Sequence, residues 1–235
     1  MIQTSIKILP AILELDYFKV KDYMEKFSKV ATSVQIDVCD GIFVESKTWL
    51  PKATDDINGY NLDLEFDMMV SDIDKYLEVI YNYDVKKIII HTDNMSVEDY
   101  VSIYQKIKSK NKLVRVAICD RDMEKIKSAY GHYDYVQIMG IQRVGKQGQL
   151  FDVTVLDKIK YIKLFFLTKH KSQTEESVDD NIIANMYIQI DGAMNIETIQ
   201  KCKEAGASSF VVGSYLKSAI KENKLKEAYQ SLKNI

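Results

Sequence analysis

The sequence predicts a closed (β/α)8 barrel of the TIM-barrel type, and three observations support this prediction. Eight short apolar segments of strand type alternate with segments of helical spacing. The strand segments are apolar at nearly every position, as expected when both faces of a parallel sheet are covered. The length of 235 residues is ordinary for one such barrel, so we expect a single domain over 1–235. An open doubly wound sheet is the competing topology, but no Gly-x-Gly-x-x-Gly follows the first strand.

Each expected strand is a short run of β-branched, aromatic and other apolar residues between polar or turn residues. The first strand contains Pro10, which marks a strand end or a bulge. In chain order, strands are expected at 6–13, 34–39, 62–70, 87–91, 113–118, 135–139, 187–190 and 210–212.

Between the strands, apolar residues recur three or four positions apart, which is typical of helices that pack one face on a core. Asp16 is a suitable N-cap for the first of them. In chain order, helices are expected at 17–29, 73–83, 97–108, 123–130, 153–166, 196–205 and, as one or two helices, 215–232.

Two segments show neither pattern. Residues 42–60 form a long loop with Phe43 and Trp49, and we expect it to be either a lid or a subunit contact. The polar, acidic segment 169–181 is interpreted as an insertion or a mobile loop.

The composition excludes several classes of function. A net charge of −2 gives no electrostatic argument for nucleic acid or an anionic membrane, and no apolar run is long enough for a membrane span. Cys39, Cys119 and Cys202 are few and far apart, which indicates reduced thiols in the cytoplasm. The N-terminus lacks signal-peptide anatomy, so we expect a cytoplasmic protein. We also expect the protein to be a homo-oligomer.

Two strands end in the same tripeptide, Gln-Ile-Asp, at Asp37 and Asp191. An acid inside an apolar run is costly unless it is paired, binds a metal or takes part in chemistry. In a barrel these two strands lie on either side of the first strand, so the acids can flank a ligand. Two such carboxylates suit removal of a proton on one face and its return on the other. The alternative is that each acid is structural and bonded to backbone amides.

Other polar residues follow the ends of expected strands, where barrel active sites lie. Gly192, Gly213 and Ser214 occupy the positions where barrels often bind phosphate, although a Gly-Ser pair is also a common turn. His91 is either a ligand or proton carrier, or a hydrogen-bonded packing residue. Met69 and Met139 either line a pocket or fill the core.

Several segments resemble the ribulose-phosphate 3-epimerase family, in the same order along the chain. Residues 8–13 (ILPAIL) resemble the family's I-x-P-S-I-L, and residues 34–44 (VQIDVCDGIFV) resemble H-V-D-V-M-D-G-x-F-V. Residues 64–70 (LEFDMMV) resemble L-D-V-H-L-M-V. The stretches 138–151, 188–193 and 211–214 resemble its L-M-S-V-N-P-G-F-G-G-Q-x-F, I-x-V-D-G-G and V-A-G-S.

The resemblance implies a barrel of the ribulose-phosphate-binding type and epimerisation at C3 of a phosphorylated ketose through an enediolate. It implies Asp37 and Asp191 as the acid/base pair. It also implies a substrate-binding set with a phosphate grip and two pocket methionines, namely Met69, Met139, Gly148, Gly192, Gly213 and Ser214. The family's divalent metal is held by two histidines and both aspartates and stabilises the enediolate oxygens.

The departures concern the metal. Gln35 and Asp67 stand where the family has its two metal-binding histidines, and Ala11 stands at the serine of the opening strand. The resulting metal set of Gln35, Asp37, Asp67 and Asp191 is all oxygen, which favours Mg²⁺ or Mn²⁺ over Zn²⁺. Alternatively the metal is lost, and then at least one carboxylate has a raised pKa. Arg143, in the loop after the sixth strand, is one possible substitute charge.

Two rival functions remain open at this stage. The chain could be a catalytically impaired homologue that binds a sugar phosphate. It could instead perform decarboxylation or aldol chemistry, but those related barrels carry Asp-x-Lys-x-x-Asp on a strand, and the strand here reads Asp37-Val-Cys-Asp40 without the lysine.

Overall fold

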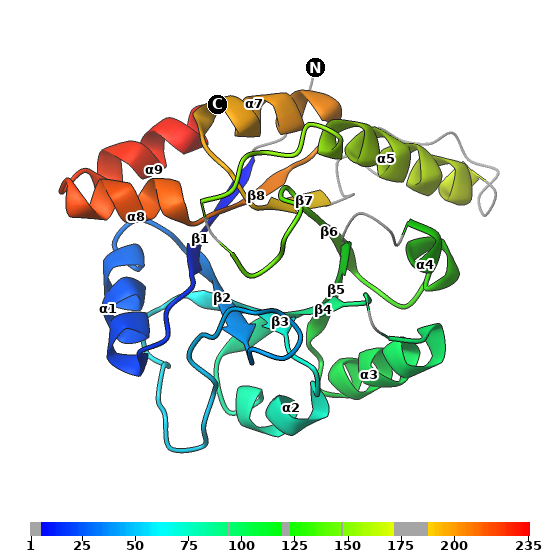
Figure 1. Cartoon of the computed structure of the whole chain (residues 1–235), viewed down its shortest axis with the longest axis horizontal. Helices are drawn as coiled ribbons and strands as arrows, with labels where there is room; N and C mark the ends of the chain where they lie inside the picture. Colours follow the sequence, from blue (N-terminus) through cyan, green and yellow to red (C-terminus); the bar gives the residue numbers. More distant parts are fainter. Residues whose placement is uncertain (1–5, 94, 119–122, 147, 172–187) are drawn as a thin grey trace.

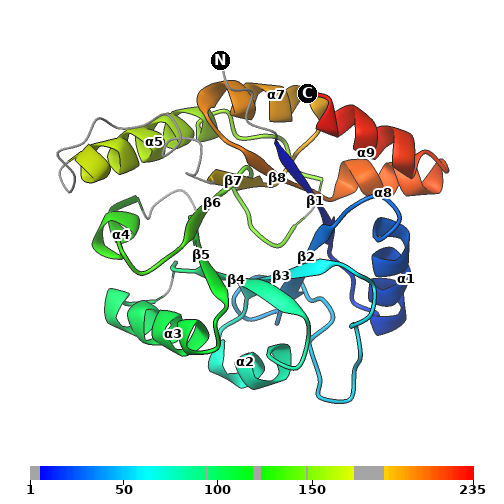
Figure 2. The same cartoon turned by 180° about the vertical axis from the view of Figure 1, so that it is seen from behind.

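The computed structural model is a barrel of strands surrounded by helices (Figures 1 and 2). It describes residues 6–93, 95–118, 123–146, 148–171 and 188–235. The sheet closes in the order β1 to β8, and β1 pairs with β8 in parallel from Lys7 opposite Ser209 to Pro10 opposite Val212. The predicted barrel is therefore confirmed, and the open-sheet alternative is excluded.

All strand pairs are parallel, and each strand lies close to its predicted position. The largest difference is at β4, which begins two residues earlier than predicted because Val85 already pairs with Leu64. The strands are β1 (Lys7–Ile12), β2 (Ser33–Cys39), β3 (Asp63–Met69), β4 (Val85–His91), β5 (Leu113–Ile118), β6 (Tyr135–Met139), β7 (Ile188–Asp191) and β8 (Ser209–Val212).

The helices cover the outside of the barrel, as the repeated strand-helix pattern predicts. Asp16 is the N-cap of the first, with its carboxylate accepting from the Phe18 and Lys19 amides. They are α1 (Tyr17–Phe27), α2 (Asp74–Ile80), α3 (Val97–Ser109), α4 (Met123–Ser128), α5 (Val155–Lys171), α7 (Ile196–Ala205), α8 (Ser214–Lys221) and α9 (Leu225–Lys233).

Two helical boundaries refine the sequence prediction. Helix α5 runs to Lys171, so the start of the predicted insertion at 169–181 is helical, and its remainder lies outside the described residues. The C-terminal segment forms two helices, α8 and α9. They are separated at Asn223, whose positive φ of 55° no helix accommodates.

The strands carry apolar residues on the helix side and polar residues inside the barrel. On β2, Ile36 and Val38 belong to the apolar core, whereas Gln35 and Asp37 alternate with them and are buried. Strand β3 repeats the pattern with Phe66 between two buried acids. Side chains alternate across a strand, so every second residue points inward. The inward side chains of these two strands are therefore polar and buried, which is an unusual setting for carboxylates.

The loop after β2 packs onto the barrel rather than standing free. Trp49 is buried, and its indole nitrogen donates to the Asp55 carboxylate at 2.8 Å. Nearer the barrel mouth, the Phe43 ring lies 5.6 Å from the His91 ring. A Cβ on Gly145, in the loop after β6, would lie 2.8 Å from the Val44 side chain. These two loops therefore meet over the site, while the role of 42–60 as a lid or a subunit contact stays a prediction.

Candidate active site

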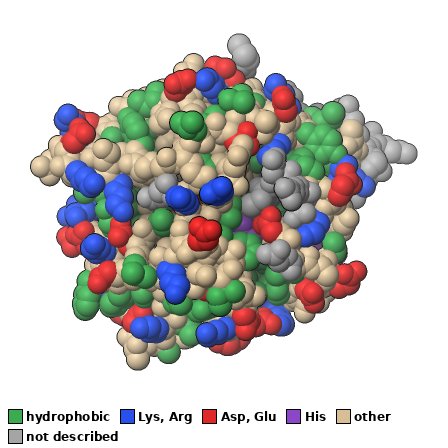
Figure 3. All heavy atoms as spheres, in the orientation of Figure 1, with side chains coloured by type: hydrophobic (Ala, Val, Ile, Leu, Met, Phe, Trp, Pro, Cys, Tyr) green, Lys and Arg blue, Asp and Glu red, His purple; other side chains and the backbone are tan. Residues whose placement is uncertain are grey.

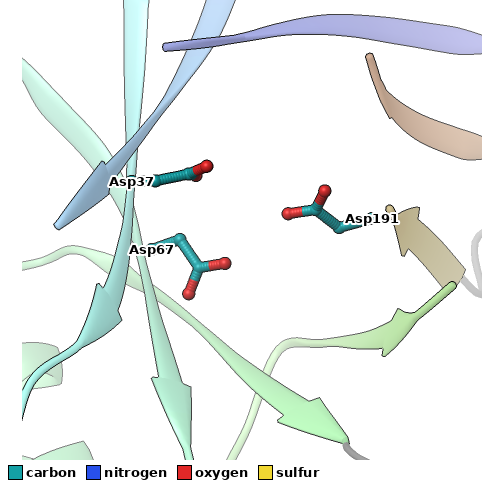
Figure 4. Close-up of side chains that lie close together, drawn as sticks. All are labelled: Asp37, Asp67 and Asp191. Carbon is teal, nitrogen blue, oxygen red and sulfur yellow. The ribbon is translucent and has the colours of Figure 1, made fainter. Parts of the chain in front are cut away.

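Three aspartates from β2, β3 and β7 point into one space inside the barrel (Figure 4). Asp37, Asp67 and Asp191 each place a carboxylate oxygen within 4.8 Å of the others. Asp37 and Asp67 are opposite one another in the β2–β3 pairing, and Asp191 reaches in from β7, on the other side of β1. The structure thus brings together the two matched acids that the sequence singled out, with Asp67 beside them.

Amide and imidazole groups hold the three carboxylates in place. Gln35 donates from Nε2 to Oδ1 of Asp37 at 2.9 Å and to Oδ2 of Asp191 at 2.6 Å. Asp67 has His91 Nε2 at 2.7 Å from Oδ1 and accepts from Nε2 of Gln137 at 3.0 Å. His91 is therefore hydrogen-bonded to an acid of the site. The sequence predicts His91 as a ligand or proton carrier, or as a hydrogen-bonded packing residue. The structure shows it buried and in contact with Asp67.

Burial dominates the acidity of the pair. It raises the pKa of Asp37 well above the ordinary value, and the negative charges of Asp191 and Asp67 raise it further. Burial and the charge of Asp67 raise the pKa of Asp191 to about 7, against the lowering effect of the Gln35 hydrogen bond. Two close carboxylates with raised pKa values titrate as a pair, so the pair keeps a proton to higher pH than exposed aspartates do.

A pocket opens from these acids toward the ends of β7 and β8. Its empty volume is about 530 Å³, part of it open to solvent. Asp37 and Asp191 line it together with every predicted substrate-binding residue, namely Met69, Met139, Gly148, Gly192, Gly213 and Ser214. Their roles remain predictions, but the structure does bring them to one cavity.

The end of this pocket at β7 and β8 has the features of an anion site. Gly213 is the N-cap of α8 with no side-chain cap, so Ser214 and the following backbone N–H groups lack a capping partner there. Gly192 has φ 109°, and a Cβ at this position would come 2.8 Å from Ile141. Glycine is therefore required by both conformation and space. Lys146 also lines the pocket and adds positive charge.

The three carboxylates could hold a divalent cation, because they supply only oxygen atoms at close spacing. Gln35 does not complete that set in the orientation observed, because it presents its nitrogen, and an amide nitrogen with two hydrogens is a donor. The Gln35 contribution to a metal site thus stays a prediction that requires the amide to turn. Arg143 lies in the loop above, beside a second hollow lined by Phe43, Glu45 and Asp93.

One level deeper, the barrel contains a polar group that sequence reasoning missed. Glu65 of β3 accepts from Nη1 of Arg115 and Nζ of Lys87, both at 2.7 Å. Gln137 and Gln189 are also fully buried at this level. The signal was present in the sequence, because Gln35, Glu65, Gln137 and Gln189 each precede a site residue by two positions and therefore share its face of the strand.

Comparison with known proteins agrees with this geometry. The profile of the "Ribulose-phosphate 3 epimerase family" matches residues 7–217. The chain belongs to this family. A ribulose-phosphate 3-epimerase of Bacillus subtilis is 26% identical over 212 residues, 89% of this chain and 91% of the relative. One from Chlamydia muridarum is 25% identical over 218 residues, 92% and 90% of the two chains.

Membership makes the chain a ribulose-phosphate 3-epimerase-like isomerase, of the class that epimerises carbohydrates. Solved structures support the fold alone. A 3-hexulose-6-phosphate synthase has a TM-score of 0.63 at 13% identity and covers 97% of this chain and 99% of its own. A 3-keto-L-gulonate-6-phosphate decarboxylase from Vibrio cholerae has a TM-score of 0.65 at 12% identity, covering 98% and 97%.

The surface charge is mixed on the face that can be seen. Figure 3 shows acidic and basic side chains interspersed over the face it displays, with no broad patch of one sign. Among the described residues, every helix is too short or too polar to span a bilayer.

Proposed function

We propose that this family member epimerises a phosphorylated ketose at C3, either ribulose 5-phosphate or a related pentulose or hexulose phosphate. The observation that carries the proposal is the pair Asp37 and Asp191, which reach one pocket from strands on opposite sides of β1. One carboxylate removes the C3 proton beside the C2 carbonyl, which gives an enediolate. The other returns a proton to the opposite face.

The electrostatics of the pair suit this reaction. Epimerisation in both directions requires one protonated acid and one ionised base at the same pH. A pKa of about 7 at Asp191, with Asp37 also raised, keeps such a mixed state populated near neutrality. An ordinary exposed aspartate would be almost fully ionised at pH 7 and could not serve as the acid.

Binding of the phosphate at the β7–β8 end would place the sugar chain between the two acids. The Gly213–Ser214 end of α8 offers backbone donors to the phosphate, and Gly192 allows a close approach. Met69 and Met139 supply apolar walls that limit water around the enediolate.

A divalent cation, Mg²⁺ or Mn²⁺ rather than Zn²⁺, would be held by Asp37, Asp67 and Asp191, and when bound it would polarise the sugar oxygens. The protein's own residues supply the proton transfers in either case. Asp67 stays with His91 and Gln137 and adds negative charge beside the pair.

The test is deuterium exchange at C3. Purified protein would be incubated in D₂O with a panel of ketopentose and ketohexose phosphates, with and without Mg²⁺ or Mn²⁺, and followed by NMR. We expect deuterium at C3 and formation of the C3 epimer for at least one substrate. Absence of exchange across the panel would contradict the proposal.

A second candidate is a family member that binds a sugar phosphate without turning it over. It is favoured by the loss of both histidine positions, because none of the three close ligand groups is a nitrogen. This function predicts that sugar phosphates raise the melting temperature while no C3 exchange occurs. Thermal unfolding run beside the exchange assay separates the two candidates.

A further inference from the structure

Gln35 lies between the two proposed acid/base residues and contacts both. Its Nε2 is 2.9 Å from Oδ1 of Asp37 and 2.6 Å from Oδ2 of Asp191, and its side chain has no exposed surface. The other oxygens, Oδ2 of Asp37 and Oδ1 of Asp191, accept no hydrogen bond from the described residues. One amide therefore occupies one oxygen of each acid and leaves the second oxygen for the substrate.

The direction of this amide is fixed from below by a branching chain of hydrogen bonds. Ser209 Oγ donates to Oε1 of Gln189 at 2.7 Å, so Gln189 presents its nitrogen to the rest of the network. That nitrogen donates to Oε1 of Gln35 at 3.1 Å and to Oε1 of Gln137 at 2.8 Å. It also lies 3.5 Å from Oε2 of Glu65. Its two hydrogens are therefore shared among oxygen acceptors, and Gln35 and Gln137 must show it their oxygens.

The hydrogen bonds of this network all run in one direction, from Ser209 toward the carboxylates. With their oxygens facing Gln189, Gln35 and Gln137 present their nitrogens to the carboxylates of the site. Turning the Gln35 amide to offer its oxygen to a cation would set its nitrogen against the nitrogen of Gln189. It would also leave Asp37 and Asp191 without these donors. Leaving buried polar groups unsatisfied is unfavourable, so the network opposes the turn.

We propose that Gln35 is a positioning residue for the acid/base pair, held in a donor orientation by Gln189 and Ser209, and is not a cation ligand. The proposal rests on the proposed epimerase function. Its two N–H groups fix the relative directions of Asp37 and Asp191. They assign Oδ2 of Asp37 and Oδ1 of Asp191 as the oxygens that exchange protons with C3. Gln189 acts through Gln35 and touches no substrate.

A double-mutant cycle tests the connection. Gln35→Met keeps the length of the side chain and removes its donors, and we expect kcat to fall roughly 10–100-fold with KM within about threefold. Gln189→Met should lower kcat about tenfold in the wild type but less than about twofold in the Gln35→Met background. Additive effects of the two substitutions would overturn the proposal.

Substitutions of two neighbouring serines test the first hydrogen bond of this network with milder changes. Ser209→Ala removes the donor to Gln189 and should lower kcat severalfold. Ser208→Ala removes an adjacent hydroxyl that is buried and has no partner among the described residues, and it should leave kcat unchanged. Equal effects of the two substitutions would contradict the proposed connection from Ser209 through Gln189 to Gln35. This pair remains informative if Gln35→Met folds poorly.

A binding measurement decides the donor assignment without catalysis. Mn²⁺ affinity of the wild type and Gln35→Met would be compared by calorimetry or electron paramagnetic resonance. We expect Gln35→Met to bind Mn²⁺ as well as the wild type or better, or neither protein to bind it. A tenfold or greater loss would show that Gln35 is a ligand and overturn the proposal. Failure of C3 exchange in the wild type would instead contradict the proposed function.

Discussion

Strand β3 buries two carboxylates two residues apart, and their surroundings give them opposite electrostatic settings. Glu65 lies among cations, with Arg115 and Lys87 at 2.7 Å and Lys7 at 3.4 Å. Asp67 lies one level higher, with His91 Nε2 at 2.7 Å, Gln137 Nε2 at 3.0 Å and the other acids of the site nearby. Both side chains are almost completely buried.

The lower level contains Glu65, Arg115 and Lys87, and the upper level contains Asp37, Asp67 and Asp191. The two levels differ in the pKa values of their carboxylates. Burial would raise the pKa of Glu65, but Arg115 and Lys87 lower it to about 2, so Glu65 is ionised near neutral pH. In the upper level burial and the charge of Asp67 outweigh the lowering effects of Gln35, His91 and Arg115, and the pKa of Asp191 is raised to about 7. Burial raises the pKa of a carboxylate unless nearby positive charge compensates for it. We therefore expect a structural role for the lower level and a chemical role for the upper level.

The largest expected effect is on activity in the upper level. Asp37→Asn and Asp191→Asn each keep the shape of the side chain and remove its ability to exchange a proton. We expect each to lower formation of the C3 epimer about 10²–10⁴-fold without loss of folding, as measured by NMR and circular dichroism. Asp63→Asn, at the exposed start of β3, is the matched control and should retain full epimer formation. Epimer formation at the wild-type rate in either site variant would contradict the chemical role of this level.

The corresponding change in the lower level should affect stability instead. Glu65→Gln leaves Arg115 and Lys87 buried without their carboxylate, and we expect the free energy of unfolding to fall by about 3–5 kcal/mol in a denaturant titration. Glu25→Gln breaks an exposed pair with Lys29 on α1 and should change it by less than about 1 kcal/mol. A Glu65→Gln protein as stable as the Glu25→Gln control would remove the distinction between the levels.

The pH dependence of stability should have opposite slopes for the two levels. The pKa of Asp191 is higher folded than unfolded, so the wild type should lose stability relative to Asp191→Asn as pH rises from about 4 to about 7. The pKa of Glu65 is lower folded than unfolded. The wild type should therefore lose stability relative to Glu65→Gln as pH falls from about 4.5 to about 2. Denaturation curves in the presence of a chelator measure both slopes, and slopes of the same sign would refute the contrast.

The smallest expected effect is from Asp67, which adds charge to the upper level but transfers no proton in this mechanism. Asp67→Asn removes a negative charge beside Asp37 and Asp191, so the pKa values of the pair should fall and the pH profile of exchange should shift to lower pH. We expect the rate at the new optimum to stay within about tenfold of the wild type. A complete loss of exchange would show that a cation held by Asp67 is indispensable.

Much of the fold followed from the sequence because its signals are local. Parallel strands of a barrel read as continuous apolar runs, and their positions were predicted closely. Matched Gln-Ile-Asp strand ends located Asp37 and Asp191, and the rule that sites lie at the carboxyl ends of barrel strands gathered the remaining pocket residues.

The lower level could not be predicted in the same way. The alternation along each strand indicates that its members face inward, but it does not indicate which of them meet. Gln189 of β7 and Gln35 of β2 are 154 residues apart, so their contact across the barrel leaves no local trace. The direction of the Gln35 amide follows from Ser209, which lies two residues before the stretch 211–214 and belongs to no motif of the site. The sequence therefore indicated which side chain replaces the family's histidine but not that its nitrogen faces the acids.

The most direct test of the central claim follows one substrate on both faces of C3. Wild-type protein and ribulose 5-phosphate in D₂O would be monitored by NMR for deuterium at C3 in the remaining substrate and in the epimer. We predict incorporation in both, with Asp37→Asn and Asp191→Asn each blocking epimer formation. Epimer that forms without solvent deuterium, or in either variant at the wild-type rate, would contradict two-sided proton transfer by this pair.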